Sequence, residues 1–131
     1  MKRFTLFRAS RAVLLASLLL VGAIALPTTA SATTVDECQA QLTQLRADTV
    51  AAQSSFANAK DFNGAIGKLD AAALKLSERK NADAVLKLQD FQMLLNALAT
   101  APKPKLDPAT AQALVPEAQG VIDCINQIGT A

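Results

Sequence analysis

Apolar residues in this chain recur at intervals of three and four positions, and this spacing restricts the fold more than any other feature. Steps that average 3.5 residues place an apolar stripe along one side of an α-helix. Thr34, followed three positions later by Glu37, is a capping-box signature for the start of the first helix. Residues 58–64, which end in Gly64, are expected to interrupt the pattern. The first run steps by 3, 4, 3, 4, 3 and 4, through Val35, Cys38, Leu42, Leu45, Thr49, Ala52 and Phe56.

Two further helices are predicted over residues 65–79 and 82–100. Asn81 is expected to cap the second of these. Met93 and Leu94 widen its apolar stripe, so this helix is expected to be the most buried one. The shared faces consist of Ile66, Leu69, Ala73 and Leu76 in one helix, and Ala84, Leu88, Phe91, Leu95 and Leu98 in the other.

A fourth helix is predicted after a connector at residues 101–105, whose sequence APKPK cannot continue a helix. Asp107 supplies a cap and Pro108 suits the first helical position. Pro116 lies beyond the first turn and is expected to kink or split the helix near residues 112–115, so that a short segment precedes a longer one that ends before Gly129. The apolar face of this region consists of Ala111, Leu114, Ala118, Val121, Ile125 and Ile128.

The first 32 residues have the three parts of a secretory signal peptide. Residues 1–11 carry four basic residues and no acidic one, residues 12–26 are almost entirely apolar, and residues 30–32 read Ala-Ser-Ala. A permanent membrane anchor is the alternative, but a spanning helix needs about 20 apolar residues. We therefore expect residues 1–32 to be removed on export, and residues 33–131 to form a single secreted or periplasmic domain.

The basic excess of the chain belongs to this leader. The whole chain has a net charge of +2, whereas residues 33–131 hold nine Lys and Arg against eleven Asp and Glu. A domain with this balance has no basic surface for nucleic acid or anionic lipid. We expect no nucleic-acid partner, and contact with the membrane only through the signal peptide before its cleavage. The expected partner is an extracellular or envelope protein or a glycan.

The two cysteines, Cys38 and Cys124, lie near the two ends of the expected domain. Exported proteins meet an oxidising compartment, so we expect a Cys38–Cys124 disulfide. A redox-active pair would normally show C-x-x-C spacing, which is absent. In an up-down-up-down bundle the start of the first helix and the end of the last lie together, within reach of such a bond. The predicted fold is therefore all-α, a small antiparallel four-helix bundle.

The composition excludes several kinds of chemistry. The chain has no His, Trp or Tyr and only two Cys. A Ser-His-Asp or Cys-His nucleophile would lack its base, and the usual cluster of zinc ligands cannot be assembled. Residues 61–64 offer oxygen ligands but lack the twelve-residue EF-hand pattern, so they are expected to form a loop and helix cap. We expect no catalytic residue, no cofactor and no metal.

Residues 65 to 125 resemble the FIMAH family of bacterial extracellular helical modules. The matching stretches are IGKLDAA at 66–72, KNADAVLKLQDF at 80–91, LDPATAQAL at 106–114 and AQGVI at 118–122. The most specific part is K-L-x-x-F, which precedes a basic loop and a second capped helix. The resemblance implies an accessory module of larger secreted proteins, without catalytic residues. This chain departs from that pattern in having its own first helix and a disulfide.

Four residues are candidates for contact with a ligand or partner. Phe62 and Phe91 could line an apolar cavity, although both also suit the core of a bundle. Lys103 and Lys105 form a compact basic spot that could contact an acidic glycan or partner, or only keep the connector solvated. The expected function is that of a non-enzymatic secreted interaction or structural module that binds a protein or cell-envelope component. The alternative is a carrier of a small apolar ligand, held between helices near Phe91 and Pro116.

Overall fold

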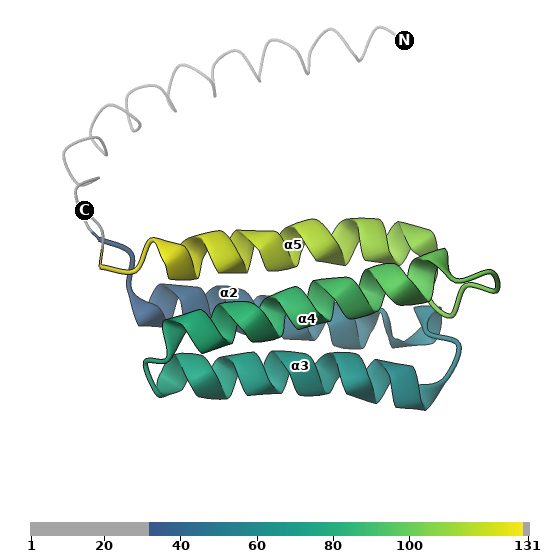
Figure 1. Cartoon of the computed structure of the whole chain (residues 1–131), viewed down its shortest axis with the longest axis horizontal. Coiled ribbons are helices and arrows are strands. Elements are labelled where there is room, and N and C mark those ends of the chain that lie inside the picture. The colour runs from purple at the N-terminus through teal and green to yellow at the C-terminus, as the bar shows by residue number, and fades with distance from the viewer. Residues whose placement is uncertain (1–31, 130–131) are drawn as a thin grey trace, which may run out of the picture. The chain divides into compact units, whose positions relative to one another are not determined.

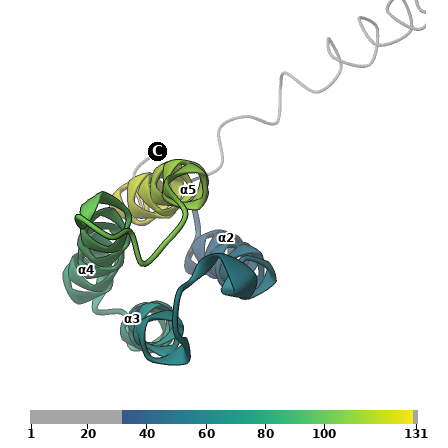
Figure 2. The ribbon, with the colours of Figure 1, turned by 90° about the vertical axis from the view of Figure 1, so that its right-hand side faces the viewer.

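The computed structural model describes residues 32–129, so all but the last residue of the predicted signal peptide lies outside the described part of the chain. Within this range there are four α-helices, α2 (Val35–Ala51), α3 (Ala59–Ser77), α4 (Asn81–Thr100) and α5 (Pro108–Asn126), and a short 3-10 helix, η2 (Gln53–Ser55). The four α-helices run side by side in alternating directions and occupy the corners of a square in chain order (Figure 1, Figure 2). The predicted up-down-up-down bundle is confirmed.

The core is built from most of the predicted apolar stripes, which face one another in the centre of the bundle. The face of α3 is rotated from the predicted one, since Phe62, Ala65 and Ala72 are buried, whereas Ile66 and Ala73 are only partly buried. Thr49 is the one polar residue that is buried among residues 32–129, and its hydroxyl donates to the Leu45 carbonyl at 2.8 Å. Met93 does not join the stripe of α4, because it lies on the opposite side of the helix and its side chain is 62% exposed. The largest fully buried apolar side chains are Phe91, Leu42, Leu45, Leu69, Leu76, Leu88, Leu95, Leu106 and Val121.

α2 begins where the sequence predicts and ends earlier than its apolar spacing suggests. The Thr34 side chain accepts from the Glu37 amide at 3.2 Å, and the Glu37 carboxylate accepts from the Thr34 amide at 2.7 Å, which completes the capping box. The helix stops at Ala51, and η2 follows it. Phe56 keeps its place in the core but lies in extended backbone beyond the helix.

α3 begins six residues before the predicted start, because Asn58 acts as its N-cap. The Asn58 side chain accepts from the Asp61 amide at 2.8 Å. The expected interruption at residues 58–64 is therefore wrong, and Asp61 to Gly64 lie in the first turns of the helix rather than in a loop. An exposed glycine near a helix start costs about 1 kcal/mol, which the cap can offset.

A tight turn joins α3 to α4, and it corrects the prediction that Asn81 is a cap. Lys80 occupies the cap position without a side-chain hydrogen bond, and Asn81 is the first residue of the helix. The preceding turn is a Schellman motif, in which the Lys80 amide donates to the Lys75 carbonyl at 2.9 Å and the Arg79 amide donates to the Leu76 carbonyl at 3.0 Å. Arg79 adopts a φ of 63° at the position where glycine is usual. The Lys80 carbonyl accepts the first backbone hydrogen bond of α4, from the Ala84 amide at 3.0 Å, so the helix begins one residue before the predicted start.

α5 is one continuous helix, so the predicted division near residues 112–115 is wrong. Asp107 caps it and Pro108 begins it, both as predicted. Pro116 lies inside the helix on an exposed side, so the carbonyl that loses its helical donor, that of Gln112, can meet solvent. Beside it, Gln92 of α4 donates to the Val115 carbonyl at 3.1 Å and so binds the backbone next to the proline.

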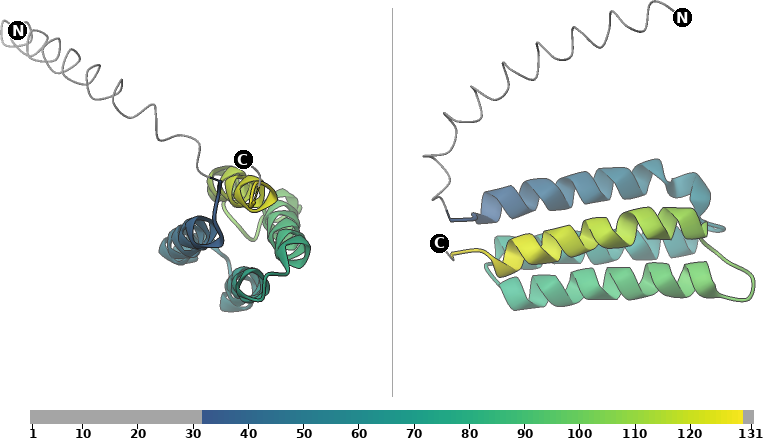
Figure 3. Two further views of the ribbon diagram at one scale, coloured as in Figure 1. Left: turned by 90° about the vertical axis from the view of Figure 1, so that its left-hand side faces the viewer. Right: turned by 90° about the horizontal axis from the view of Figure 1, so that it is seen from above.

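The bundle is tied together at both ends. At one end the predicted disulfide is confirmed, since Cys38 of α2 and Cys124 of α5 are bonded with their Cα atoms 5.6 Å apart. Figure 3 shows α2 and α5 as neighbours from two directions. At the same end Thr33 and Ile128 form a parallel β-bridge, and the Gly129 amide donates to the Thr33 carbonyl at 3.3 Å. The last helix is therefore held against the first by a covalent bond and by backbone pairing.

Candidate functional site

At the other end of the bundle, the two connectors pair with each other. Phe56 and Leu106 form an antiparallel β-bridge. The Ala57 amide donates to the Lys105 carbonyl at 2.8 Å, and the Asp107 amide donates to the Ser55 carbonyl at 3.1 Å. This pairing fixes the backbone around the predicted basic spot.

The four candidate contact residues do not come together in one site. Phe91 is fully buried in the middle of the core, where it contacts only other side chains of the bundle. Phe62 is 8% exposed, and its ring packs edge-on against Phe56 with centroids 5.5 Å apart. Lys103 and Lys105 are exposed on the α4–α5 connector, at the end of the bundle where Phe62 also lies. The structure thus brings Phe62 near the basic connector and separates Phe91 from both.

A groove between α4 and α5, here called the α4–α5 groove, is the most apolar of the described surface hollows. It has a volume of about 360 Å³. Its walls carry no charged residue, although charged residues make up 18% of the chain. The lining residues are Asn96, Ala99, Thr100, Pro108, Ala111, Gln112, Val115 and Pro116.

The α4–α5 groove is the surface hollow beside Pro116, one of the two residues of the predicted ligand site. Pro116 is exposed and lines the groove, whereas Phe91 is fully buried. The predicted ligand site between helices near both residues is therefore divided, and only the Pro116 side is accessible. Sequence spacing did not reveal this groove, because the spacing of Ala99, Ala111 and Val115 does not show how closely the surfaces of two neighbouring helices meet.

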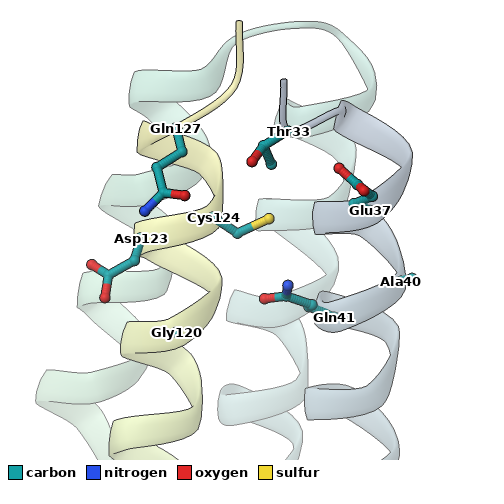
Figure 4. Close-up of a pocket in the computed structure, with 8 residues that line it drawn as sticks. All are labelled: Thr33, Glu37, Ala40, Gln41, Gly120, Asp123, Cys124 and Gln127. Atoms are coloured by element: carbon teal, nitrogen blue, oxygen red, sulfur yellow. The ribbon is translucent and has the colours of Figure 1, made fainter. Parts of the chain in front are cut away.

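A second groove, the α2–α5 groove, lies over the disulfide and is polar. Figure 4 shows Glu37 and Gln41 on the α2 side and Asp123 and Gln127 on the α5 side, with Cys124 between the two helices. The groove has a volume of about 520 Å³. Its lining holds two carboxylates, Glu37 and Asp123, and no cation, since the one cation of α2 and α5, Arg46, is not among the lining residues. That cation is engaged elsewhere.

Arg46 points to the opposite flank of α2 and pairs with Asp70 of α3. Its Nε lies 2.7 Å from the Asp70 Oδ1, and its second contact, to Oδ2, measures 3.4 Å. This hydrogen bond and the charge of Asp70 raise the pKa of the Arg46 guanidinium. The carboxylates of the α2–α5 interface therefore have no cation from either helix to balance them.

One carboxyl pair lies directly between α2 and α5. Partial burial, a hydrogen bond with Asp48 and the charge of Asp48 raise the pKa of Glu117 from its ordinary value of 4.5 to about 7. Asp48 also accepts a hydrogen bond from the Gln44 amide at 2.8 Å. Near neutral pH Glu117 is therefore partly protonated and can donate to Asp48. The pair could not be predicted from the sequence, because it depends on the rotation of two helices about their axes.

Residues 32–129 contain neither a cluster of metal-ligating side chains nor a helix that could span a membrane. In that range no three Cys, Asp or Glu residues gather in a way that could hold a metal ion. None of the helices described there has both the length and the hydropathy needed to cross a membrane.

Comparison with known proteins found no match to this chain among protein-family models, curated proteins or solved structures.

Proposed function

We propose that this chain is an exported, non-enzymatic binding module, which holds a protein or other component of the cell envelope through its α4–α5 groove. The observation that carries the proposal is the lining of that groove, which is uncharged and the most apolar of the described hollows. Contiguous apolar surface with a few polar groups is characteristic of interaction sites. The disulfide and the leader-like composition of residues 1–32 support a location outside the cytoplasm.

The backbone of α5 adds a specific polar contact to the α4–α5 groove. Pro116 has no N–H group, so the carbonyl of Gln112 has no helical donor four residues ahead. Both residues line the groove. An accepting carbonyl between apolar walls can orient a partner that inserts an apolar side chain together with a hydrogen-bond donor.

The resemblance of residues 65–125 to FIMAH modules supports the same proposal. Such modules are accessory parts of secreted proteins and contribute no catalytic residues. The resembling stretches lie in and beside α3, α4 and α5. They include Pro108, Ala111 and Gln112 on the α5 wall of the α4–α5 groove, whereas the α4 wall lies beyond the stretch that ends at Phe91.

The test compares two glutamines that are both exposed on helices and both line grooves. Gln112→Lys places a charge in the α4–α5 groove, and Gln41→Lys does the same in the α2–α5 groove. With cell-envelope extracts as the source, we expect Gln41→Lys to retain the partner that the wild type captures and Gln112→Lys to lose it. Equal recovery by both variants, or no recovery by the wild type, would contradict the proposal.

A carrier of a small apolar ligand is the second candidate, and the volume and walls of the same groove favour it. The ligand would lie against Ala111, Val115 and Pro116 on the surface, and away from Phe91. Native mass spectrometry of the exported protein should then show an added mass that Gln112→Lys removes. A bare polypeptide whose melting does not respond to apolar probes would eliminate this candidate.

A further inference from the structure

The outer face of α4 carries an exposed apolar stripe that the core does not use. Among residues 32–129, the large apolar side chains that are strongly exposed are Val50, Leu74, Leu86 and Met93. Only Leu86 and Met93 share a helix face, since they are seven residues, or two turns, apart. Ala82 and Ala97 are also exposed and extend this face in both directions. In end view α4 occupies a corner of the bundle between α3 and α5 (Figure 2).

We infer that this face, here called the α4 stripe, is the interface of a symmetric dimer in which the α4 helices of two copies pack antiparallel. The α4 stripe is defined by Ala82, Leu86, Met93 and Ala97. It is separate from the α4–α5 groove, and the inference does not rest on the proposed function. Three features of α4 support a second copy as the occupant.

The first feature is the symmetry of the stripe about its own midpoint. Leu86 and Met93 are equally far from the point between Gln89 and Asp90, and so are Ala82 and Ala97. When two such helices lie antiparallel across a twofold axis at this point, Leu86 faces Met93 of the second copy. Each large residue then meets a large one and each alanine meets an alanine, which is the self-complementarity that an isologous interface requires.

The second feature is the position of the charges of α4. Asp83, Lys87 and Asp90 follow one another at steps of four and three, on the same flank as Leu94. That flank borders α3, because Leu94 Cδ2 lies 3.9 Å from the position of a Cβ on Gly64. The opposite flank, which borders α5 through Gln92, carries no charge. The charged side chains of α4 therefore form a row along one edge of the stripe.

The third feature is that an antiparallel twofold axis brings these charged edges together. An antiparallel pair sets the α3 flank of one copy against the α3 flank of the other. Two symmetric Lys87–Asp90 pairs then form across the axis, each within two residues, or about 3 Å along the helix, of the same level. They outnumber the one like-charge pair, because the two Asp90 residues also lie within one residue of the same level. A parallel pair would instead set the charged edge against the uncharged one and leave Lys87 and Asp90 without cross-copy partners. The charges thus favour the antiparallel arrangement.

The size of the α4 stripe sets the strength expected of the dimer. α4 has 20 residues and is therefore about 30 Å long. A contact along one helix is smaller than the roughly 800 Å² that each partner buries in a standard interface. We therefore expect a reversible dimer that forms at protein concentrations on the order of 10–100 µM.

The test is sedimentation equilibrium of the oxidised protein, recovered from an exporting host, over a range of concentrations. Met93→Lys and Leu86→Lys should each weaken dimerisation at least tenfold. Leu74→Lys is the matched control, because Leu74 and Leu86 are both 56% exposed and only Leu74 lies on α3. All three positions are at the surface, so thermal melting should show that the variants fold. A wild type that stays monomeric up to about 1 mM, or equal effects of Leu74→Lys and Met93→Lys, would overturn the inference.

A charge exchange tests the orientation. Lys87→Glu and Asp90→Lys should each weaken the dimer several-fold, and the double variant should recover most of the loss because the cross-copy pairs form again with exchanged signs. A double variant that is weaker than either single variant would rule out the antiparallel arrangement. Gln112→Lys should leave dimerisation unchanged, so that failure of the dimer and failure of the α4–α5 groove as a binding site are distinguishable.

Discussion

Glu117 makes the stability of the contact between α2 and α5 depend on pH. Its pKa is raised to about 7 because it is partly buried beside Asp48. The folded protein therefore holds this proton more tightly than the unfolded chain, in which the carboxyl titrates near 4.5. The stabilisation is complete below about pH 4.5 and is lost as pH rises through 7, since the ionised pair then repels.

Glu117→Gln should remove this dependence, because a neutral amide can donate to Asp48 at every pH. We expect the variant to be more stable than the wild type at pH 8 by about 1 kcal/mol, a value reduced because the pair is partly open to water. The measurement is the urea midpoint at pH 5 and pH 8. Asp123→Asn on the same helix is the control, and its urea midpoint should change between pH 5 and pH 8 as much as that of the wild type does. A wild type equally stable at both pH values would show that the carboxyl pair does not form.

For single residues, the sequence predicts some contacts of the candidate site and misses others. Cys38 and Cys124 could be paired from their positions, because two cysteines in an exported chain allow one intramolecular bond. The contact of Asp48 with Glu117 could not be predicted, because the spacing of carboxylates along each helix does not show how the two helices are rotated toward each other. Lys103 and Lys105 were found as a basic spot, yet the sequence did not show that their connector pairs with the one after α2.

At the scale of elements, apolar spacing predicted which residues form helices, and local capping decided where the helices begin. The capping box at Thr34 and the cap at Asp107 were correctly predicted, since each needs only residues within three positions. The start of α3 was missed because Asn58 caps a helix whose first turns contain Gly64. Asn81 was misassigned as a cap because the Schellman turn ends with Arg79 in a conformation that non-glycine residues seldom adopt.

Pro116 allows the stability of α5 to be tested by a single substitution. An interior proline costs a helix about 3 kcal/mol relative to alanine, and part of this cost is avoided here because the freed carbonyl can meet solvent. Alanine also increases the freedom of the unfolded chain, which opposes the gain. Pro116→Ala should therefore raise the free energy of unfolding by about 1–2 kcal/mol, measured by urea denaturation.

Pro108→Ala is the matched control for this prediction. Pro108 occupies the first position of α5, where the amide would have no helical acceptor. Its replacement should change stability by less than about 0.5 kcal/mol. Equal effects of the two substitutions would show that α5 accommodates Pro116 at no cost.

For the whole molecule, the disulfide decides how stable the closed bundle is. The bond closes a loop with a sequence separation of 86 residues. In the chain-entropy model a loop of this length contributes about 4–5 kcal/mol, compared with a total of about 5–15 kcal/mol for a typical domain. The contact between α2 and α5 is thus stabilised by restricting the unfolded chain as well as by packing.

The double variant Cys38→Ala/Cys124→Ala should melt roughly 20 °C below the oxidised wild type. Wild type treated with reductant should melt close to the variant, because both lack the crosslink and differ only in two small buried side chains. Differential scanning calorimetry with and without reductant measures both effects. A variant that melts with the oxidised wild type would show that the crosslink adds nothing to the bundle.

The pairing of Thr33 with Ile128 has a topological consequence. Because the Gly129 amide donates to the Thr33 carbonyl, a linker of a few glycines could join residue 129 to residue 33 and make the backbone of the bundle circular. The ring could then be opened within residues 101–107, which would yield a circular permutant that starts at α5 and finishes with α4. In such a molecule an ordinary peptide linker would connect α5 to α2, and the sulfur crosslink between them would become redundant.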